Sequence, residues 1–415
     1  METVVDLFAG CGGMSLGLEM AGFETVYVNE LHPDAMSTFL MNRKNTFLDQ
    51  PGNHSYDITV ISRSKVQRTK LANELKRKYG NIDLLAGGPP CQGFSGIGHR
   101  RSFSVDKKDI PTNHLYRDMA RIIEAIAPKV FIFENVRGLL NSKWTKNGSK
   151  GEIWEDVLKT FRSVATEFGG KNLKYKIEWQ LLFSKDYGVP QNRPRIILIG
   201  IREDVYLKNF NSIKKYGYFP KPFGQAPDPC DVLGDLVDPK WQKKFKTSYY
   251  VKNPKNEIQK YFRKKNGSIS KIGHLLTDQE YSKHKPEIIE KFQYMIDNEG
   301  RVPKRFETKK FAQRLLPRRW SNIGPNITVA SLPDDFVHYS QPRILTVREW
   351  ARLQTFPDWY QFSGKRTTGG QRRAGNPDLE NWYRELPKYT QIGNAVPVLL
   401  AKAIGEHLRK IITFR

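Results

Sequence analysis

The sequence predicts an α/β fold, in which helices cover both faces of a mostly parallel sheet, together with a second, smaller domain. From residue 3 to about 200, short apolar segments rich in β-branched and aromatic residues alternate with segments of helical spacing. Such alternation is typical of a parallel sheet, because each helix carries the chain back to the start of the next strand. From about 203 to 320 the alternation fades, and lysines and arginines mix with aromatic residues. That change in pattern indicates a separate unit.

The elements follow in order along the chain. Buried strands are predicted at 3–8, 24–28, 82–87, 129–136 and 195–201, and helices at 15–22, 34–42, 115–127, 346–356 and 396–412. These elements divide the chain into a first domain at 1–202, a smaller domain at 203–320, and a return to the first domain at 321–415. Ligands bind at the carboxyl ends of the strands in such sheets, so the functional residues are expected there.

The charge of the chain points to a polyanionic partner. Its 415 residues include 68 lysines and arginines against 43 aspartates and glutamates, which gives a formal net charge of +25. A field of that sign attracts phosphate backbones and binds them by releasing counterions, so nucleic acid is the first inference. An anionic membrane surface and a merely solvated basic surface are the alternatives.

Cysteine usage and hydropathy exclude several classes of protein. No apolar run approaches the roughly 20 residues of a membrane span, and the N-terminal segment has no features of a signal peptide. Cys11, Cys91 and Cys230 lie far apart, and the eight histidines form no ligand cluster. We therefore expect neither a disulfide scaffold nor a metal site, and a cytoplasmic location fits.

A glycine-rich loop follows the first predicted strand, in DLFAGCGGMSLGL at 6–18. Its glycines allow the backbone to approach a bound molecule closely. About twenty residues later, Glu30 ends the second strand, where an acid can accept hydrogen bonds from ribose hydroxyls. The loop has neither GxGxxG spacing nor the Lys-Ser/Thr of a phosphate-binding loop, so a nucleoside cofactor without a pyrophosphate is predicted. Asp57 either receives an adenine amino group or is an ordinary surface aspartate.

The segment GGPPCQGFS, residues 87–95, holds one cysteine between two prolines and a glycine. Prolines fix their own backbone angles and restrict the residue before them, so this is a shaped loop that presents Cys91. On this segment alone, a proline turn with a small buried cysteine is an equal alternative.

Six segments together resemble the motifs of DNA cytosine-C5 methyltransferases, in the order usual for that family. They are DLFAGCGG, GGPPCQGFS, FENVRGLL, GVPQNRPR, TVREWARLQTFP and QIGNAVP. The resemblance covers the chain from residue 3 to about 405 and leaves only the middle basic region without shared motifs. The resemblance implies a Rossmann-like, S-adenosylmethionine-dependent methyltransferase domain with a smaller DNA target-recognition domain. It also implies methyl transfer from S-adenosyl-L-methionine to C5 of a cytosine flipped out of a short, specific duplex sequence.

The same resemblance assigns catalytic roles. Cys91 matches the thiolate that adds to cytosine C6, and Glu134 matches the acid that donates to N3. Arg193 and Arg195 match the arginine pair near the base, with pairing to phosphate or to the protein as the alternative. Asn135 is expected to fix the geometry of the loop.

The resemblance likewise implies cofactor and DNA contacts. The residues matched to S-adenosylmethionine contacts are Phe8, Gly10, Cys11, Gly13, Glu30, Asp57, Ile58, Pro90, Leu115, Asn394 and Val396. Cys11 would contribute backbone and packing rather than a thiolate. The basic segment after Cys91 resembles a loop that closes over the flipped base, with Ser95, Arg100 and Arg101 near the DNA backbone. Two features depart from the family: residues 363–388 look like an insertion, and the glycine usual before Asp57 is missing.

We therefore predict a stand-alone enzyme of restriction–modification type that acts on double-stranded DNA, functions beside a restriction endonuclease and is a monomer. Its specificity is expected to lie in 203–320, since side chains there can match base edges in the major groove. An RNA cytosine-5 methyltransferase and a catalytically silent DNA-binding regulator are the alternatives. A dehydrogenase is a further alternative, but it gives the PPCQG loop no role.

Overall fold

The computed structural model describes residues 1–43, 47–90, 106–307, 313–320, 335–367 and 385–414. The predicted nucleophile Cys91 and the predicted DNA contacts Ser95, Arg100 and Arg101 lie outside these residues. Within them, no helix is both long and apolar enough to cross a membrane.

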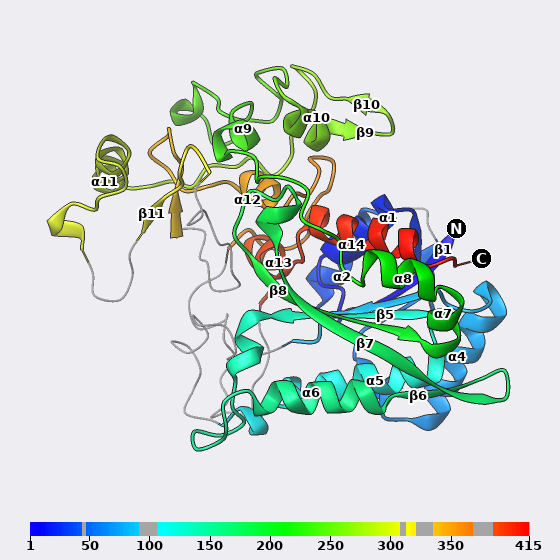
Figure 1. The fold of residues 1–415 in the computed structure, drawn as a ribbon. Coiled ribbons are helices and arrows are strands. Elements are labelled where there is room, and N and C mark those ends of the chain that lie inside the picture. The colour runs from blue at the N-terminus through cyan, green and yellow to red at the C-terminus, as the bar shows by residue number, and fades with distance from the viewer. Residues whose placement is uncertain (44–46, 91–105, 308–312, 321–334, 368–384, 415) are drawn as a thin grey trace.

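A single eight-stranded sheet forms the centre of the larger part of the molecule (Figure 1), with the strand order β3-β2-β1-β4-β5-β8-β7-β6. Its strands are β1 (Glu2–Leu7), β2 (Phe23–Asn29), β3 (His54–Ser55), β4 (Leu84–Gly87), β5 (Val130–Val136), β6 (Ala165–Phe168), β7 (Lys171–Phe183) and β8 (Pro194–Arg202). The first five run parallel to one another. This confirms the α/β fold and each of the five predicted strands.

One strand departs from the predicted parallel arrangement. β8 pairs antiparallel with both β5 and β7. The reason is the short connection between β7 and β8, which leaves no room for the crossover that parallel neighbours need. The pairing has a consequence for function, because it brings the start of β8 to the edge where β5 ends.

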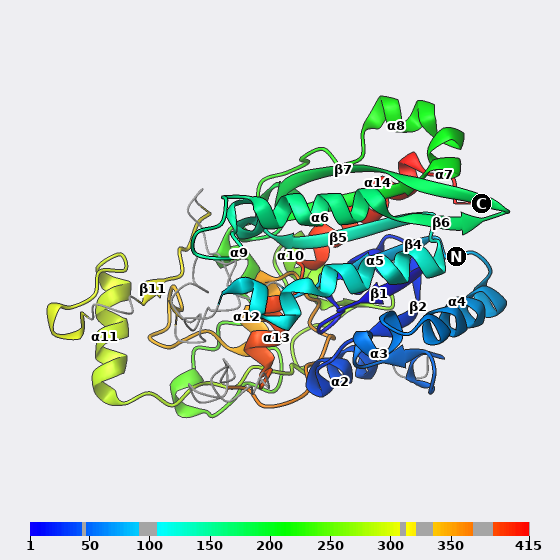
Figure 2. The same cartoon turned by 90° about the horizontal axis from the view of Figure 1, so that it is seen from below.

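Helices cover both faces of the sheet (Figures 1 and 2). On one face lie α3 (Ile58–Ser62), α4 (Lys65–Tyr79), α5 (Leu115–Ile126) and α6 (Glu152–Ser163). On the other lie α1 (Gly13–Met20), α7 (Glu203–Lys208), α8 (Phe210–Tyr216) and α14 (Val398–Ile411). The final helix, α14, has 14 residues and returns the chain to the first domain, where it packs beside α1.

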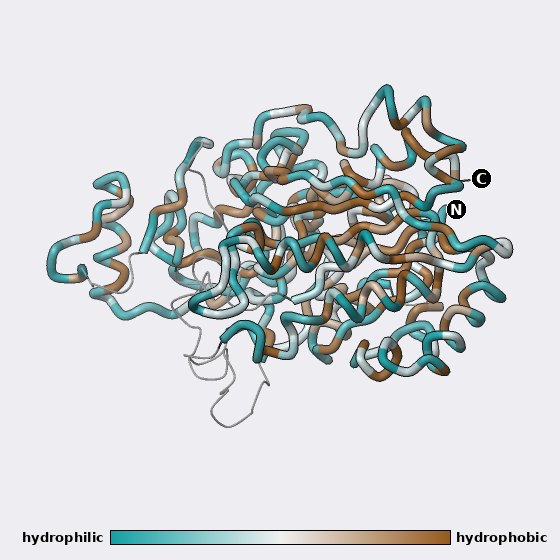
Figure 3. The backbone as a smooth tube through the Cα atoms, turned by 60° about the horizontal axis from the view of Figure 1, so that its bottom comes forward, coloured by the Kyte–Doolittle hydropathy of each residue, from teal (hydrophilic) through white to brown (hydrophobic). Residues whose placement is uncertain are grey.

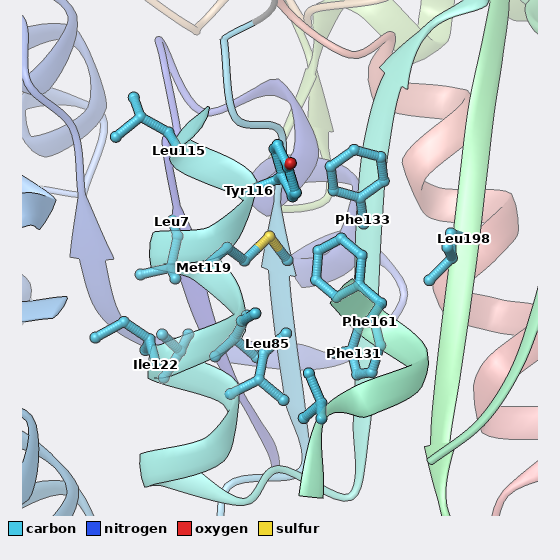
Figure 4. Packing of buried hydrophobic residues seen from close by; sticks show 14 of the residues in the cluster. Leu7, Leu85, Leu115, Tyr116, Met119, Ile122, Phe131, Phe133, Phe161 and Leu198 are labelled. Atoms are coloured by element: carbon cyan, nitrogen blue, oxygen red, sulfur yellow. The ribbon is translucent and has the colours of Figure 1, made fainter. Parts of the chain in front are cut away.

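Strand periodicity explains why both faces are covered. Along β5, Phe131 and Phe133 pack with α5 and α6, whereas Val130 and Ile132 pack with the helices of the opposite face. Successive side chains of a strand point to opposite sides, so a strand that is apolar throughout needs a helix layer on each face. Figure 3 shows these hydrophobic strands at the centre. Figure 4 shows Met119 of α5 beside Phe133 of β5 and Phe161 of α6.

A second core joins the middle of the chain to segments near its end. It combines α9 (Pro229–Leu233), α10 (Glu257–Arg263), α12 (Val347–Leu353) and α13 (Lys388–Asn394). The Thr346 hydroxyl and the Glu349 carboxylate start α12 with a reciprocal capping box. Two residues of the first loop and helix, Cys11 and Leu16, also belong to this core. The glycine-rich loop is therefore supported from the second core as well as from the sheet.

A small outlying lobe carries α11 (Pro286–Asp297), β11 (Arg314–Leu315) and β12 (Phe336–Val337). Among the described residues of this lobe, Phe292, Met295, Val337 and Ile344 form a small buried cluster with three partly buried neighbours. The short strands β9 (Lys264–Lys265) and β10 (Ser268–Ile269) form a hairpin after α10.

Candidate active site

The predicted site residues gather at one edge of the sheet. The loops after β1, β2, β3, β4 and β5 all leave from this edge, because these strands are parallel. The antiparallel β8 adds its first residues there, with Arg195 opposite Val136 in the register. The edge therefore combines the ends of five strands with the start of a sixth.

The glycine-rich loop after β1 is tied to the loop after β2 through Glu30. Phe8 and Gly10 have positive φ angles of 58° and 57°, which turn the chain sharply away from the strand. The amide of Gly10 donates to Glu30 Oε2 at 2.8 Å, and the amide of His32 donates to Glu30 Oε1 at 2.8 Å. Burial raises the pKa of Glu30, and these two amides oppose the rise. The carboxylate is thus held in place, while its oxygens keep lone pairs for further donors.

The same loop packs directly against the QIGNAVP segment. A Cβ atom on Gly13 would lie 2.4 Å from the carbonyl oxygen of Val396, so only glycine fits there. Cys11 donates from its sulfur to the carbonyl oxygen of Gln391 at 3.3 Å, and burial raises the pKa of its thiol. A buried thiol of this kind packs and does not ionise, as the sequence predicts for Cys11.

The remaining predicted cofactor residues lie on neighbouring loops. Asp57 is the N-cap of α3, and its Oδ1 accepts from the amide of Thr59 at 2.8 Å. Ile58 and Leu115 are buried in one cluster, whereas Asn394 is exposed at the end of α13. Prediction from the sequence overlooked Leu31, whose side chain is 62% exposed directly after Glu30. A leucine directly after the acid that ends the second strand is the only sequence signal for it.

A buried ion pair lies where β5 and β8 meet. The Arg195 Nε atom lies 2.7 Å from Glu134 Oε1, and Glu134 is 9% exposed. Burial raises the pKa of Glu134, while the charges of Arg195 and Arg193 oppose the rise. The pair thus combines a carboxyl group that burial shifts towards its protonated form with a fixed positive charge, and such a pair can form hydrogen bonds to a heterocyclic base.

The segment that leads to Cys91 passes directly over this pair. A Cβ atom on Gly88 would lie 2.8 Å from Glu134 Oε2, so this glycine lets the chain approach the carboxyl group. Asn135 donates from Nδ2 to the carbonyl oxygen of Pro89 at 3.1 Å, as expected of a residue that fixes the loop. Pro90 follows, exposed, as the last described residue before Cys91.

The two predicted arginines have different partners. Arg193 is fully buried, and its Nη2 donates to the carbonyl oxygen of Gly393 at 2.6 Å. Nearby, Gln191 donates to the carbonyl oxygen of Leu353 at 2.5 Å, and Gln354 donates to that of Ile392 at 2.9 Å. The QNRPR segment is thereby fastened to the two motifs near the end of the chain. Arg195, in contrast, pairs with Glu134.

Asp6 was also overlooked, although it lies in the first motif. It is 1% exposed and accepts a hydrogen bond from the hydroxyl of Ser15, which links β1 to α1 beneath the glycine-rich loop. Burial raises the pKa of Asp6 to about 7, although the Ser15 hydrogen bond and Arg43 oppose the rise. An acid at the end of an otherwise apolar strand is the only sequence signal for it.

Known proteins match the chain over nearly its whole length. Residues 2–410 match the family of C-5 cytosine-specific DNA methylases. The type II methyltransferase M.DdeI of Desulfomicrobium norvegicum is 30% identical over 419 residues, which cover 98% of this chain and 88% of that protein. The type II methyltransferase M1.HphI of Haemophilus parahaemolyticus is 29% identical, with 99% of this chain and 87% of that protein covered. A putative DNA modification methyltransferase encoded within an E. coli prophage has a similar fold, with a TM-score of 0.66 at 22% identity over 99% of both chains.

Asp6 should make stability depend on pH. Its pKa is higher in the folded protein, about 7, than the ordinary value of 3.8, so the folded state binds the proton more tightly. Stability from this group is therefore present at low pH and is lost as pH rises towards 7. Asp6→Asn has no charge to bury, so its free energy of unfolding relative to the wild type should increase by about 3 kcal/mol between pH 5 and pH 8. Urea unfolding at both pH values measures this change, and parallel pH profiles for the two proteins would contradict it.

Proposed function

Because the chain belongs to the family of C-5 cytosine-specific DNA methylases, we propose a mechanism in which Cys91 and Glu134 act together on a cytosine flipped out of duplex DNA. The chain is a DNA (cytosine-5-)-methyltransferase of the type II restriction–modification kind. The observation that carries the proposal is the buried Glu134–Arg195 pair, with the Gly88–Pro89 segment lying over it.

Cytosine C5 is a poor nucleophile until the ring is activated. In the proposed reaction, the thiolate of Cys91 forms a bond to C6, and the carboxyl group of Glu134 donates its proton to N3. The electron pair then at C5 forms the new bond to the methyl carbon, while the bond between that carbon and the cofactor sulfur breaks and its electron pair stays on the sulfur. Water takes the C5 proton, the electron pair of that bond re-forms the C5–C6 double bond, and the Cys91 sulfur leaves C6 as a thiolate. Return of the N3 proton to Glu134 then restores the neutral base and the free enzyme.

Glu134 and Arg195 have different proposed roles at the cytosine ring. Burial favours the protonated carboxyl form of Glu134, which donation to N3 requires. A base that enters this edge excludes more water and strengthens that preference. Arg195 holds Glu134 in place and, as a fixed positive group, stabilises negative charge that develops at cytosine O2. Arg193 donates to the carbonyl oxygen of Gly393, and this contact helps to hold the segment that carries Arg195 in place.

The loops after β1, β2 and β3 fit the nucleoside part of S-adenosyl-L-methionine. Glu30 offers carboxylate oxygens to ribose hydroxyls, and the exposed Leu31 and the buried Ile58 offer apolar contact to adenine. The sharp turn at Phe8 and Gly10 leaves the backbone open to close approach. When bound, this cofactor supplies the methyl group on a positively charged sulfur. The other proposed contacts are Cys11, Gly13, Asp57, Pro90, Leu115, Asn394 and Val396.

Target recognition is proposed for the basic middle of the chain. The first part of the predicted 203–320 region, as far as Phe219, packs on the first domain. The contacts to bases are therefore proposed for the part of that region that follows Phe219. Ser95, Arg100 and Arg101 are proposed to lie near the DNA backbone. The type II relatives support a functional pairing with a restriction endonuclease, and we propose that the enzyme acts as a monomer.

Bisulfite sequencing of a plasmid from cells that express the protein tests the function. We expect cytosines protected from conversion in one short sequence context, because methylation at C5 slows deamination of the ring. The matched control is Cys91→Ala, which should leave every such cytosine convertible. A soluble protein with no protected cytosines would contradict methylation of DNA, and protection by Cys91→Ala would contradict the role of Cys91.

Glu134→Gln tests the proton donor. Glutamine keeps the shape of the side chain but cannot transfer a proton, so methyl transfer should slow by about 10²- to 10⁴-fold. In the wild type, the rate of methyl transfer should fall as pH rises through the pKa of Glu134, because the reaction needs the protonated carboxyl group. The rate of Glu134→Gln should not show this fall with rising pH. Single-turnover transfer of a labelled methyl group across pH measures both effects. Binding of DNA and cofactor should stay within about threefold of wild type; an unchanged rate or pH profile would refute the assignment.

A further inference from the structure

Tyr360 lies beneath the glycine-rich loop, although it is distant from that loop in sequence. The side chain is fully buried, and its hydroxyl donates to the carbonyl oxygen of Cys11 at 2.6 Å. A Cβ atom on Gly12 would lie 2.6 Å from the same hydroxyl oxygen. The turn at Cys11 and Gly12 therefore rests directly on this hydroxyl group.

The direction of the Tyr360 hydroxyl is set by Arg43. Arg43 Nη1 donates to the Tyr360 oxygen at 3.2 Å. Its other nitrogens bind Glu19 at 2.8 Å each, and its guanidinium lies 3.9 Å from the ring centroid of Phe39. Since Arg43 can only donate, the single hydroxyl hydrogen of Tyr360 is left for Cys11.

The backbone around Tyr360 is held by two buried arginines of α12. Arg348 donates to the carbonyl oxygens of Pro357 and Tyr360, at 3.1 and 2.8 Å. Arg352 binds Asp358 at 2.6 Å and also binds Asp235, which follows α9, at 2.5 Å. Buried charges persist only where they are paired, and here the pairs fix the turn at 357–360. Tyr360 thus joins the second core, through this turn, to the glycine-rich loop.

We propose that Tyr360 is a positioning residue for S-adenosylmethionine. It holds the Cys11 carbonyl, and with it the turn from Gly10 to Gly12, in the conformation that the cofactor binds. The inference rests on the proposed function, since it concerns the same cofactor site. It predicts that loss of one hydroxyl group, on a residue that does not touch the reacting atoms, weakens cofactor binding.

Tyr360→Phe tests the inference, with Tyr389→Phe as its matched control. Tyr389 belongs to the same core, is 2% exposed, and donates its hydroxyl to a backbone carbonyl, that of Leu345, at 2.7 Å. Each variant loses one buried hydroxyl and keeps its ring. The ring of Tyr360 packs between Phe356 and Phe362, with centroid distances of 5.0 and 5.7 Å, so the Phe variant should fold.

Cofactor affinity by calorimetry and steady-state methylation are measured for the wild type and both variants. We expect Tyr360→Phe to raise the Kd and KM for S-adenosylmethionine by about five- to tenfold, with kcat at saturating cofactor within about twofold of wild type. Tyr389→Phe should leave Kd and KM unchanged, although both variants lower the melting temperature to a similar degree. Equal Kd values for the two variants would overturn the inference while leaving the proposed function intact. A wild type that neither binds the cofactor nor methylates DNA would overturn the proposed function itself.

Discussion

The site depends on the ion pair between Glu134 and Arg195, which is buried where the parallel half of the sheet meets the antiparallel half. A buried carboxyl group is costly unless a charged partner lies close, and β8 provides that partner only because it runs antiparallel to β5 and starts at the edge where β5 ends. The same edge receives the segment that leads to Cys91, which Gly88 and Asn135 hold over the carboxyl group. The sheet topology therefore decides which groups lie together at this edge.

A second set of contacts joins parts of the chain that are far apart in sequence. Gln191 and Arg193 fasten one motif to the last two, and Tyr360 supports the glycine-rich loop from the core shared by α9, α10 and α12. These contacts end on backbone carbonyls, which fixes the path of each loop. The glycine-rich loop, Glu134 and the end of the chain thus form one connected unit at the edge of the sheet.

Much of the fold and part of the candidate site could be predicted from the sequence, for physical reasons that differ between elements. The five buried strands were found because each is largely apolar and rich in β-branched or aromatic residues, and the glycine-rich loop, Glu30 and Glu134 because each follows or ends such a strand. The long strand β7 was not found, since charged residues interrupt its apolar ones on a largely exposed surface. The direction of β8 depends on which strands it pairs with, and the separate partners of Arg193 and Arg195 depend on contacts with distant parts of the chain. A local sequence pattern indicates neither of these. The burial of Asp6 and of Tyr360, and the contact of Tyr360 with Cys11 across 349 residues, depend on the tertiary structure and leave little or no signal in the local sequence.

The most direct test of the central claim is to trap the bond between Cys91 and the base. A duplex with 5-fluorocytosine at the methylated position has no proton to lose from C5, so the enzyme should stay bonded to C6 after methyl transfer. The account predicts a complex that resists denaturation, requires S-adenosylmethionine, is absent with Cys91→Ala, and yields an adduct on the peptide that contains residue 91. An adduct on another residue, or methylation of normal DNA by a protein that forms no adduct with the fluorinated duplex, would contradict it.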